Sequence, residues 1–245
     1  MLLVVQTALE LGFLYAPVAL ALFLSFRVLD IADLTTDGCF VLGAAVSVTL
    51  TAAGHPLLAL PAAMLAGACS GFVTAFLQTK LGVESILAVI IVNTGLYTVN
   101  LAVMGWSSNL SIYGSDSLFT LCKELFPWEW WAKWHELVVL AVILLVAALL
   151  VVLFFRTRLG LSIRATGDNA DMVRASSINP SFTITVGLCL SNSLTGLAGC
   201  LIGLLNKSCD INLGTGMVTV ALASLIIGES LMGRGSIPRR VFGVI

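Results

Sequence analysis

A continuous apolar run from Leu137 to Phe155 constrains the fold more than any other feature, because it contains no polar or charged side chain. An α-helix needs about 20 mainly apolar residues to cross the hydrocarbon core of a bilayer. The rest of the chain is similar in character, with 59% hydrophobic and only 10% charged residues, which is far outside the range of soluble domains. The sequence therefore predicts an all-α, polytopic integral membrane bundle.

Seven apolar segments are expected to form spans, and Val241–Ile245 reads as the start of an eighth, so we expect about seven to eight spans in a single domain over residues 1–245. Because this last segment stops far short of crossing, we expect the native chain to continue beyond it. The segment Gly38–Ala53 is short and rich in small residues, which is typical of a broken or tightly packed helix. The seven are Val4–Phe26, Gly38–Ala53, Leu57–Leu77, Ile86–Met104, Leu137–Phe155, Ser181–Leu205 and Thr215–Met232.

The basic residues predict the orientation of these spans. Alternating the segments across a bilayer places nine of the 12 Lys and Arg residues on one side and three on the other. Since cytoplasmic loops carry the excess of basic residues, the first side is predicted to be cytoplasmic and the N-terminus external. The predicted cytoplasmic residues are Arg27, Lys80, Arg156, Arg158, Arg164, Arg174, Arg234, Arg239 and Arg240. The predicted external residues are Lys123, Lys133 and Lys207.

The predicted external loop Gly105–Glu136 holds all five tryptophans, namely Trp106, Trp128, Trp130, Trp131 and Trp134. Indoles gather at the headgroup level of membranes, so we favour an interfacial belt over an aromatic ligand cage. The same loop contains Cys122, and the next external loop contains Cys209. A disulfide between them is left open, whereas the spacing of the six cysteines argues against a metal site.

The predicted cytoplasmic loop Arg156–Pro180 is the most polar excursion between two long apolar runs. Thr166-Gly167-Asp168-Asn169 predicts a glycine turn with capping side chains, followed by a short helix over Ala170–Ala175. Met172, Ala175 and Ile178 are predicted to share one face. So short a helix is not stable alone in water, and the pattern leaves open whether it docks on another subunit or lies on lipid headgroups.

The residues Ile163-Arg164-Ala165-Thr166-Gly167-Asp168-Asn169, followed by Met172-Val173-Arg174-Ala175, resemble the cytoplasmic loop of permease subunits of bacterial ABC importers. The branch is that of the branched-chain amino acid and ribose permeases. Leu29–Gly38 with Leu42–Ala45, and Gly214–Met217 continuing to Ile226–Glu229, are similar to a subgroup that accompanies tryptophan-type or tyrosine-type binding lipoproteins. The chain departs from the family at Ser176-Ser177, where Leu-Gly is frequent.

The resemblance implies partners and a coupling role for the loop. It implies ABC ATPase subunits that bind ATP and Mg, an external substrate-binding lipoprotein, a second copy of the permease, and a place in the cell membrane among its lipids. It also implies that the loop seats in a groove of the ATPase. The residues carried over are Arg164, Ala165, Gly167, Asp168, Asn169, Met172, Arg174, Ala175 and Ile178.

Several polar or small residues inside the apolar segments suggest further roles. Asn93 and Asn192 are candidates for the translocation path, although hydrogen bonding between helices is an equal alternative for each. Gly199 and Gly203 are spaced to pack one helix closely against another. The sequence has no GxxxxGK[ST] motif and no catalytic constellation, so we expect a transporter subunit that is not itself an enzyme and holds no cofactor.

The function we predict is that of a permease that moves a small solute, an amino acid and an aromatic one in particular, delivered by an external binding protein. The alternative is an ATP-independent secondary transporter or channel, which paired ionisable residues in two broken helices would favour. A membrane scaffold is a third class. The net charge of −1 says nothing about nucleic acid, but no Lys/Arg run with interleaved aromatics occurs, so nucleic-acid binding is not expected.

Overall fold

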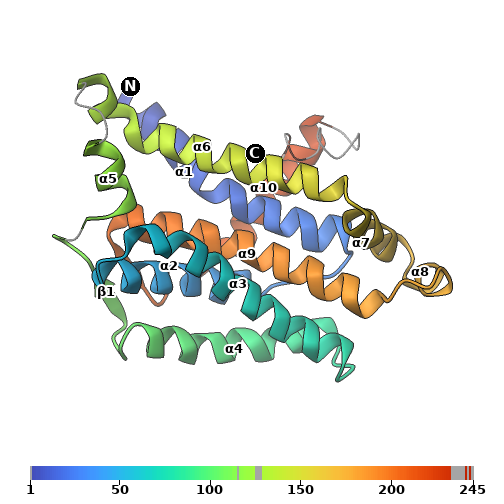
Figure 1. Ribbon diagram of the computed structural model, residues 1–245. Helices are drawn as coiled ribbons and strands as arrows, with labels where there is room; N and C mark the ends of the chain where they lie inside the picture. The colour runs from blue at the N-terminus through green and yellow to red at the C-terminus, as the bar shows by residue number, and fades with distance from the viewer. Residues whose placement is uncertain (1, 115, 125–128, 233–240, 242, 244–245) are drawn as a thin grey trace.

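Long helices form the bundle, and each of the seven apolar segments coincides with one of them (Figure 1). The computed structural model describes residues 2–114, 116–124, 129–232, 241 and 243. The long helices are α1 (Leu2–Leu22, continued by the π-helical turn η1, Phe23–Val28), α2 (Thr36–Ala52), α3 (Pro56–Thr79), α4 (Ser85–Val103), α6 (Glu129–Phe155), α9 (Pro180–Asn206) and α10 (Met217–Met232). The short elements are β1 (Asn109–Ser111), α5 (Leu118–Glu124), α7 (Arg158–Asp168), α8 (Ala170–Ala175) and β2 (Ser208–Asp210).

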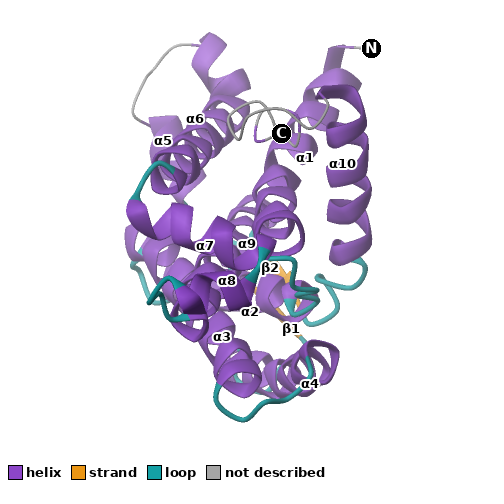
Figure 2. Ribbon diagram, turned by 90° about the vertical axis from the view of Figure 1, so that its right-hand side faces the viewer, coloured by secondary structure: helices purple, strands orange, loops and turns teal. Residues whose placement is uncertain are grey.

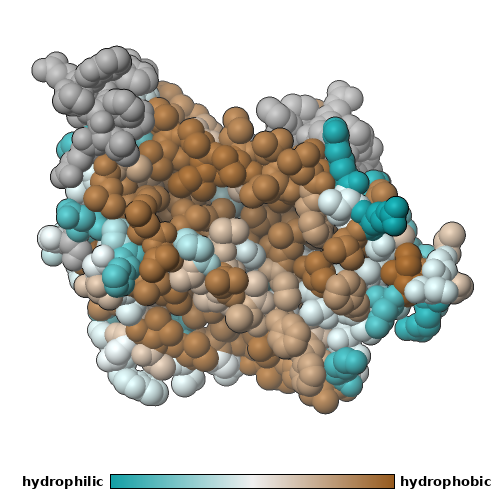
Figure 3. All heavy atoms as spheres, in the orientation of Figure 1, coloured by the Kyte–Doolittle hydropathy of each residue, from teal (hydrophilic) through white to brown (hydrophobic). Residues whose placement is uncertain are grey.

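Within the described residues, five helices are long and apolar enough to cross a membrane, and α2 and α10 are shorter. Only a minority of the side chains of α3, α4 and α6 are buried although these helices are apolar, whereas most of those of α9 are buried. Figure 3 shows the result as a continuous hydrophobic zone across the middle of one face, with hydrophilic residues at its two ends. A helical membrane bundle is thus confirmed, while the full span count and the side of the N-terminus stay predictions.

The centre of the bundle is α9, which lies between α1 on one side and α2 and α3 on the other (Figure 1). Small residues allow these helices to approach closely. A Cβ on Gly199 would overlap the carbonyl oxygen of Phe40, and a Cβ on Gly67 would overlap that of Asn192. Gly203 also faces α2, where a Cβ would lie 3.2 Å from the Ala44 Cα.

Two of the helices begin inside the bundle. After η1 the chain runs without helix from Leu29 to Thr35, so that α2 begins beside Asn192, near the middle of α9. Likewise, after β2 the chain turns back before α10 begins beside Asp37, at the start of α2. The two short helices therefore start close together, and α10 then runs beside α1 (Figure 2) to an ion pair between Arg27 and Glu229.

The two ends of the bundle differ in structure. The strand end holds the antiparallel pair β1–β2 together with α5, and the opposite end holds α7 and α8 (Figure 1). The predicted external loop is therefore structured, with β1, α5 and the first turns of α6 inside it. Trp106 is 73% exposed there. Trp128, Arg234, Arg239 and Arg240 lie outside the described residues, as does most of the predicted eighth span.

The predicted glycine turn in the polar central loop is wrong. Thr166, Gly167 and Asp168 are the last residues of α7, and Asn169 by itself caps α8. The reason is packing, because a Cβ on Gly167 would overlap the Val28 carbonyl oxygen, so glycine lets α7 lie against the end of η1. Pro180 likewise does not end the segment but opens α9, with Asn179 as its N-cap.

Cys209 is a buried thiol rather than half of the disulfide that the sequence left open. Its Sγ lies 4.0 Å from the Met104 Sδ. Burial, reinforced by the nearby Asp210 carboxylate, raises the pKa of the Cys209 thiol to about 12. Since the thiolate is the reactive form, Cys209 is chemically inert at neutral pH.

Candidate functional site

The junction of α2 and α4 is centred on Gly38. Its N–H donates to Asn93 Oδ1 at 2.9 Å, and its carbonyl oxygen accepts from Asn100 Nδ2 at 3.0 Å. Asn93 and Asn100 are seven residues apart, which places them on one face of α4. A Cβ on residue 38 would overlap Asn93 Oδ1, so only glycine allows this double contact.

Asp37 joins the same junction to α10. Its carboxylate accepts hydrogen bonds from Val218 N–H at 3.0 Å and from Gly216 N–H at 3.3 Å. The first N–H groups of a helix have no partner within the helix, and the helix dipole favours negative charge there. Asp37 therefore caps α10 from the first turn of α2, and it fixes the two short helices to each other.

A cavity of about 270 Å³ lies where α2, α4 and the segment before α10 meet. Its polar side includes Asp37, Asn93 and Asn100, and its apolar side includes Val41, Tyr97 and Ile211. Asn100 is almost fully buried, and its Oδ1 has no hydrogen-bond partner among the described residues. The other lining residues are Gly38, Asn212, Gly214 and Thr215.

Asn192 lies outside this cavity, in a second polar cluster between α9 and the segment Leu29–Thr35. Its Nδ2 donates to Asp33 Oδ2 at 2.6 Å and to the Leu188 carbonyl oxygen at 3.1 Å. Asp33 Oδ1 also accepts from the backbone N–H of Thr35 at 3.0 Å. This cluster holds the non-helical segment against the middle of α9, as the hydrogen-bonding alternative for Asn192 requires.

One side of the α7–α8 segment contacts the bundle, and its other side is exposed. The hydroxyl groups of Thr166 and Thr183 lie 2.8 Å apart and tie α7 to α9, while Val173 is the buried residue of α8. Met172 is 70% exposed, and Ala175 is exposed beside it. Ile178 lies beyond the end of α8 and is half-buried, so the three predicted residues do not form one helix face.

The remaining residues carried over to this loop are placed as follows. Asn169 Oδ1 accepts from the N–H groups of Asp171 and Met172 at 3.1 and 3.0 Å, so it organises the first turn of α8. Gly167 is half-buried against Val28. The exposed members are Arg164, Ala165, Asp168, Asn169 and Arg174.

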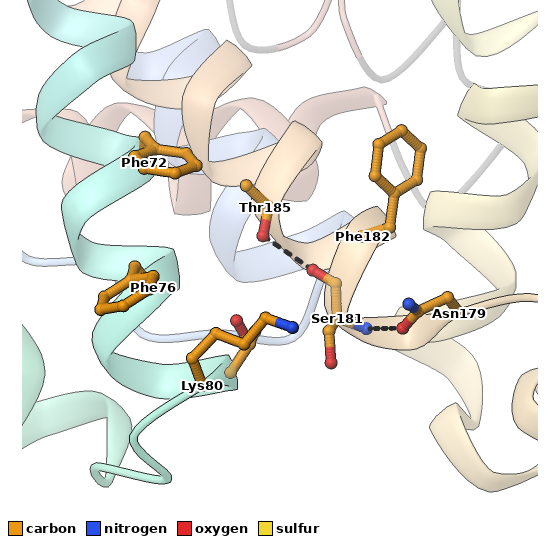
Figure 4. A pocket seen from close by; sticks show the side chains of 8 residues that line it. Phe72, Phe76, Lys80, Asn179, Ser181, Phe182 and Thr185 are labelled. Atoms are coloured by element: carbon orange, nitrogen blue, oxygen red, sulfur yellow. Dashed lines mark hydrogen bonds between the residues drawn. The ribbon is translucent and has the colours of Figure 1, made fainter.

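A second hollow of about 430 Å³ lies between α3 and α9 near the α7–α8 end (Figure 4). Phe72, Phe76 and Phe182 supply most of its walls. Asn179 Oδ1 already accepts from the Ser181 N–H, and the Thr185 hydroxyl donates to the Ser181 carbonyl oxygen. Lys80 also lines the hollow, so its walls combine the three phenyl rings with one ammonium group (Figure 4).

The sequence singled out Asn93 but missed Asp37, Gly38 and Asn100 as members of one site. A signal was present in the seven-residue spacing of Asn93 and Asn100, which puts both amides on one helix face. Asp37 gave no such signal, because its role depends on where α10 begins. Among the described residues, no group of three His, Cys, Asp or Glu side chains could hold a metal ion.

A family model and two curated relatives show which known proteins this chain is similar to. The model of the family described as "Branched-chain amino acid transport system / permease component" matches residues 4–245. A protein of Clostridioides difficile (strain R20291), "Tyrosine transport system permease protein", is 32% identical over 87% of this chain and 68% of its own length. "Uncharacterized protein RP368" of Rickettsia prowazekii (strain Madrid E) is 34% identical over 92% of this chain and 76% of its own length. No solved structure matches.

Proposed function

Because the chain belongs to the branched-chain amino acid transport system permease family, we propose that it is the membrane-spanning subunit of an ATP-driven importer of an amino acid. Membership makes it a transporter subunit rather than an enzyme. Its substrate would arrive from an external binding lipoprotein, and the named function of the C. difficile relative favours an aromatic amino acid such as tyrosine.

The observation that carries this proposal is that the short helices α2 and α10 begin close together inside the bundle, beside a polar cavity lined by α2, α4 and the segment before α10. Transporters commonly place their solute site near the bilayer midplane, where discontinuous helices begin. Asn93, which lines the cavity, is near the middle of α4. Alternating access then requires the short helices to move against the long ones, and the Asp37 cap on α10 makes them move together.

The energy source is assigned to a partner. The printed sequence contains no GxxxxGK[ST] motif, so ATP and Mg would bind a separate ATPase subunit. The exposed face of α8 around Met172 and Ala175 is the surface we assign to that ATPase. Because α7 is fixed to α9 and to η1, a push on α8 is transmitted to the helices around the cavity.

The proposed assembly has further members. A second copy of the chain would complete the translocation path, the lipoprotein would dock at the strand end, and the complex would lie in the cytoplasmic membrane. This arrangement places α7 and α8 on the cytoplasmic side, in agreement with the excess of basic residues there.

A second candidate function is ATP-independent transport, and Asp33 is the observation that favours it. This carboxyl group is 2% exposed, near the middle of the bundle, and no Lys, Arg or His of the described residues forms an ion pair with it. Ionisable groups at this depth are frequent in proton-coupled carriers. The Asn192 and Thr35 hydrogen bonds to Asp33 give it a structural role, which the importer needs equally.

The test is to express the chain with a candidate ABC ATPase and a candidate binding lipoprotein from the same genome, and to purify through a tag on the chain. The proposal expects the ATPase to co-purify and its ATP hydrolysis to rise when the lipoprotein loaded with L-tyrosine is added. An ATPase that never co-purifies, together with uptake that needs only a proton gradient, would favour the second candidate.

A further inference from the structure

The cavity between α2, α4 and the segment before α10 is lined by Asn100, whose amide oxygen accepts no hydrogen bond from the described residues. Asn100 must donate from Nδ2 to the Gly38 carbonyl oxygen, since a carbonyl oxygen cannot donate, and this fixes the orientation of the amide. Asn100 Oδ1 is then left buried without a partner among the described residues. An unpaired buried acceptor costs about 1–3 kcal/mol, so a donor from outside the chain is favoured at this position.

A second acceptor lines the same cavity. Asp37 carries a formal negative charge, and none of the ion pairs between described residues includes it. Its two hydrogen bonds come from the Gly216 and Val218 N–H groups, which leaves lone pairs on both oxygens. The cavity thus presents a carboxylate, which favours a cation, and a neutral acceptor without a partner among the described residues, which needs a donor. A cationic donor meets both requirements.

We infer that this cavity binds the ammonium group of an amino acid, with Asn100 Oδ1 and the Asp37 carboxylate as its acceptors. The inference rests on the proposed function and adds the chemical class of the bound group. An ammonium group has three donors and no acceptor, so it can donate both to Asn100 Oδ1 and to the remaining lone pairs of the Asp37 carboxylate. The apolar body of the amino acid then lies against Val41, Tyr97 and Ile211.

The size of the cavity agrees with this ligand. At about 270 Å³ it is smaller than the roughly 300–1,000 Å³ typical of pockets for drug-sized molecules. A hard inorganic cation such as Ca²⁺ would need six to eight oxygen ligands and favours several carboxylates, whereas Asp37 is the one carboxylate among the described residues that line this cavity.

The test measures equilibrium binding of radiolabelled L-tyrosine and L-leucine to the purified permease–ATPase complex in lipid nanodiscs, without the binding lipoprotein. Two competitors keep the protein unchanged: tyramine, which retains the ammonium group, and 3-(4-hydroxyphenyl)propionate, which lacks it. Tyramine is expected to displace the bound amino acid, and the deaminated acid is not.

The variants Asn100→Leu and Asp37→Asn should weaken binding about 10- to 100-fold, the loss expected for one hydrogen bond to a charged group. Asn206→Leu, outside the cavity, is the control.

Three results would overturn the inference: no binding of either amino acid at millimolar concentration, equal displacement by both competitors, or displacement by Na⁺ or K⁺ but not by tyramine. ATP-driven uptake by the same complex is measured in parallel, so that the two proposals fail separately. ATP-driven uptake without ammonium-selective binding would contradict the proposed ammonium site but not the proposed importer function. Ammonium-selective binding without any ATP-driven uptake would contradict the proposed importer function but not the proposed ammonium site.

Discussion

Asn192 Nδ2 donates a 2.6 Å hydrogen bond to Asp33 Oδ2, and this bond joins the middle of α9 to the non-helical segment that leads into α2. Both residues are almost completely buried. Asn192→Leu would leave the Asp33 carboxyl short of a donor in an apolar surrounding, at a cost of about 1–3 kcal/mol. We expect a lower melting temperature of the purified chain in detergent, whereas the exposed Asn206→Leu should melt as the parent does. Equal melting of Asn192→Leu and the parent would show that the bond contributes no stability.

Helix packing at the glycines gives a graded prediction. Gly199→Ala places a methyl group onto the Phe40 carbonyl oxygen, so α2 must move away, at a cost of about 1–3 kcal/mol. Gly203→Ala should cost less, because its nearest neighbours lie at 3.2 Å. Gly95 on α4 has no atom within 4 Å of an added Cβ, so Gly95→Ala is the matched control and should gain up to about 1 kcal/mol. Thermal unfolding of the three variants in one detergent measures the order, and a loss at Gly95 equal to that at Gly199 would contradict the packing role.

The orientation predicted from the basic residues is testable with single cysteines in a background without the native ones. Tyr113 at the strand end is 81% exposed, and Met172 on α8 is 70% exposed. An impermeant maleimide added to intact cells that express the chain without the ATPase should label Tyr113→Cys and spare Met172→Cys until the cells are permeabilised. Labelling of Met172→Cys alone in intact cells would invert the topology.

The exposed face of α8 gives a prediction about coupling. If Ala175 is covered by the ATPase, Ala175→Glu buries an unpaired carboxylate in that contact, a change that costs several kcal/mol at buried sites. Substrate-stimulated ATP hydrolysis should fall roughly tenfold or more. Asp171→Glu adds only a methylene to a side chain that is already charged and 93% exposed, so this variant should couple normally. Normal coupling by Ala175→Glu would remove α8 from the ATPase interface.

Hydropathy was sufficient to predict the seven long helices, because a long apolar segment has few ways to satisfy its backbone in a membrane, but it did not predict α5 or α7. It could not predict where α2 and α10 begin, since Leu29–Thr35 and residues 211–216 are positioned by contacts to α9 and Asp37 that are distant in sequence. The same limit explains the error at Gly167, which reads as a turn residue but serves as a packing residue against Val28. The amides of Asn93 and Asn192 were recognisable as buried polar groups, yet only the three-dimensional structure separates the one that lines the cavity from the one that holds Asp33.

The most direct test of the account is transport by the reconstituted complex. Proteoliposomes would contain the purified permease and its ATPase, with MgATP inside and the lipoprotein loaded with radiolabelled L-tyrosine outside. The account predicts that label accumulates inside only when ATP and the lipoprotein are both present, and not with a hydrolysis-deficient ATPase. Accumulation that proceeds equally without ATP, driven by a proton gradient alone, would contradict it.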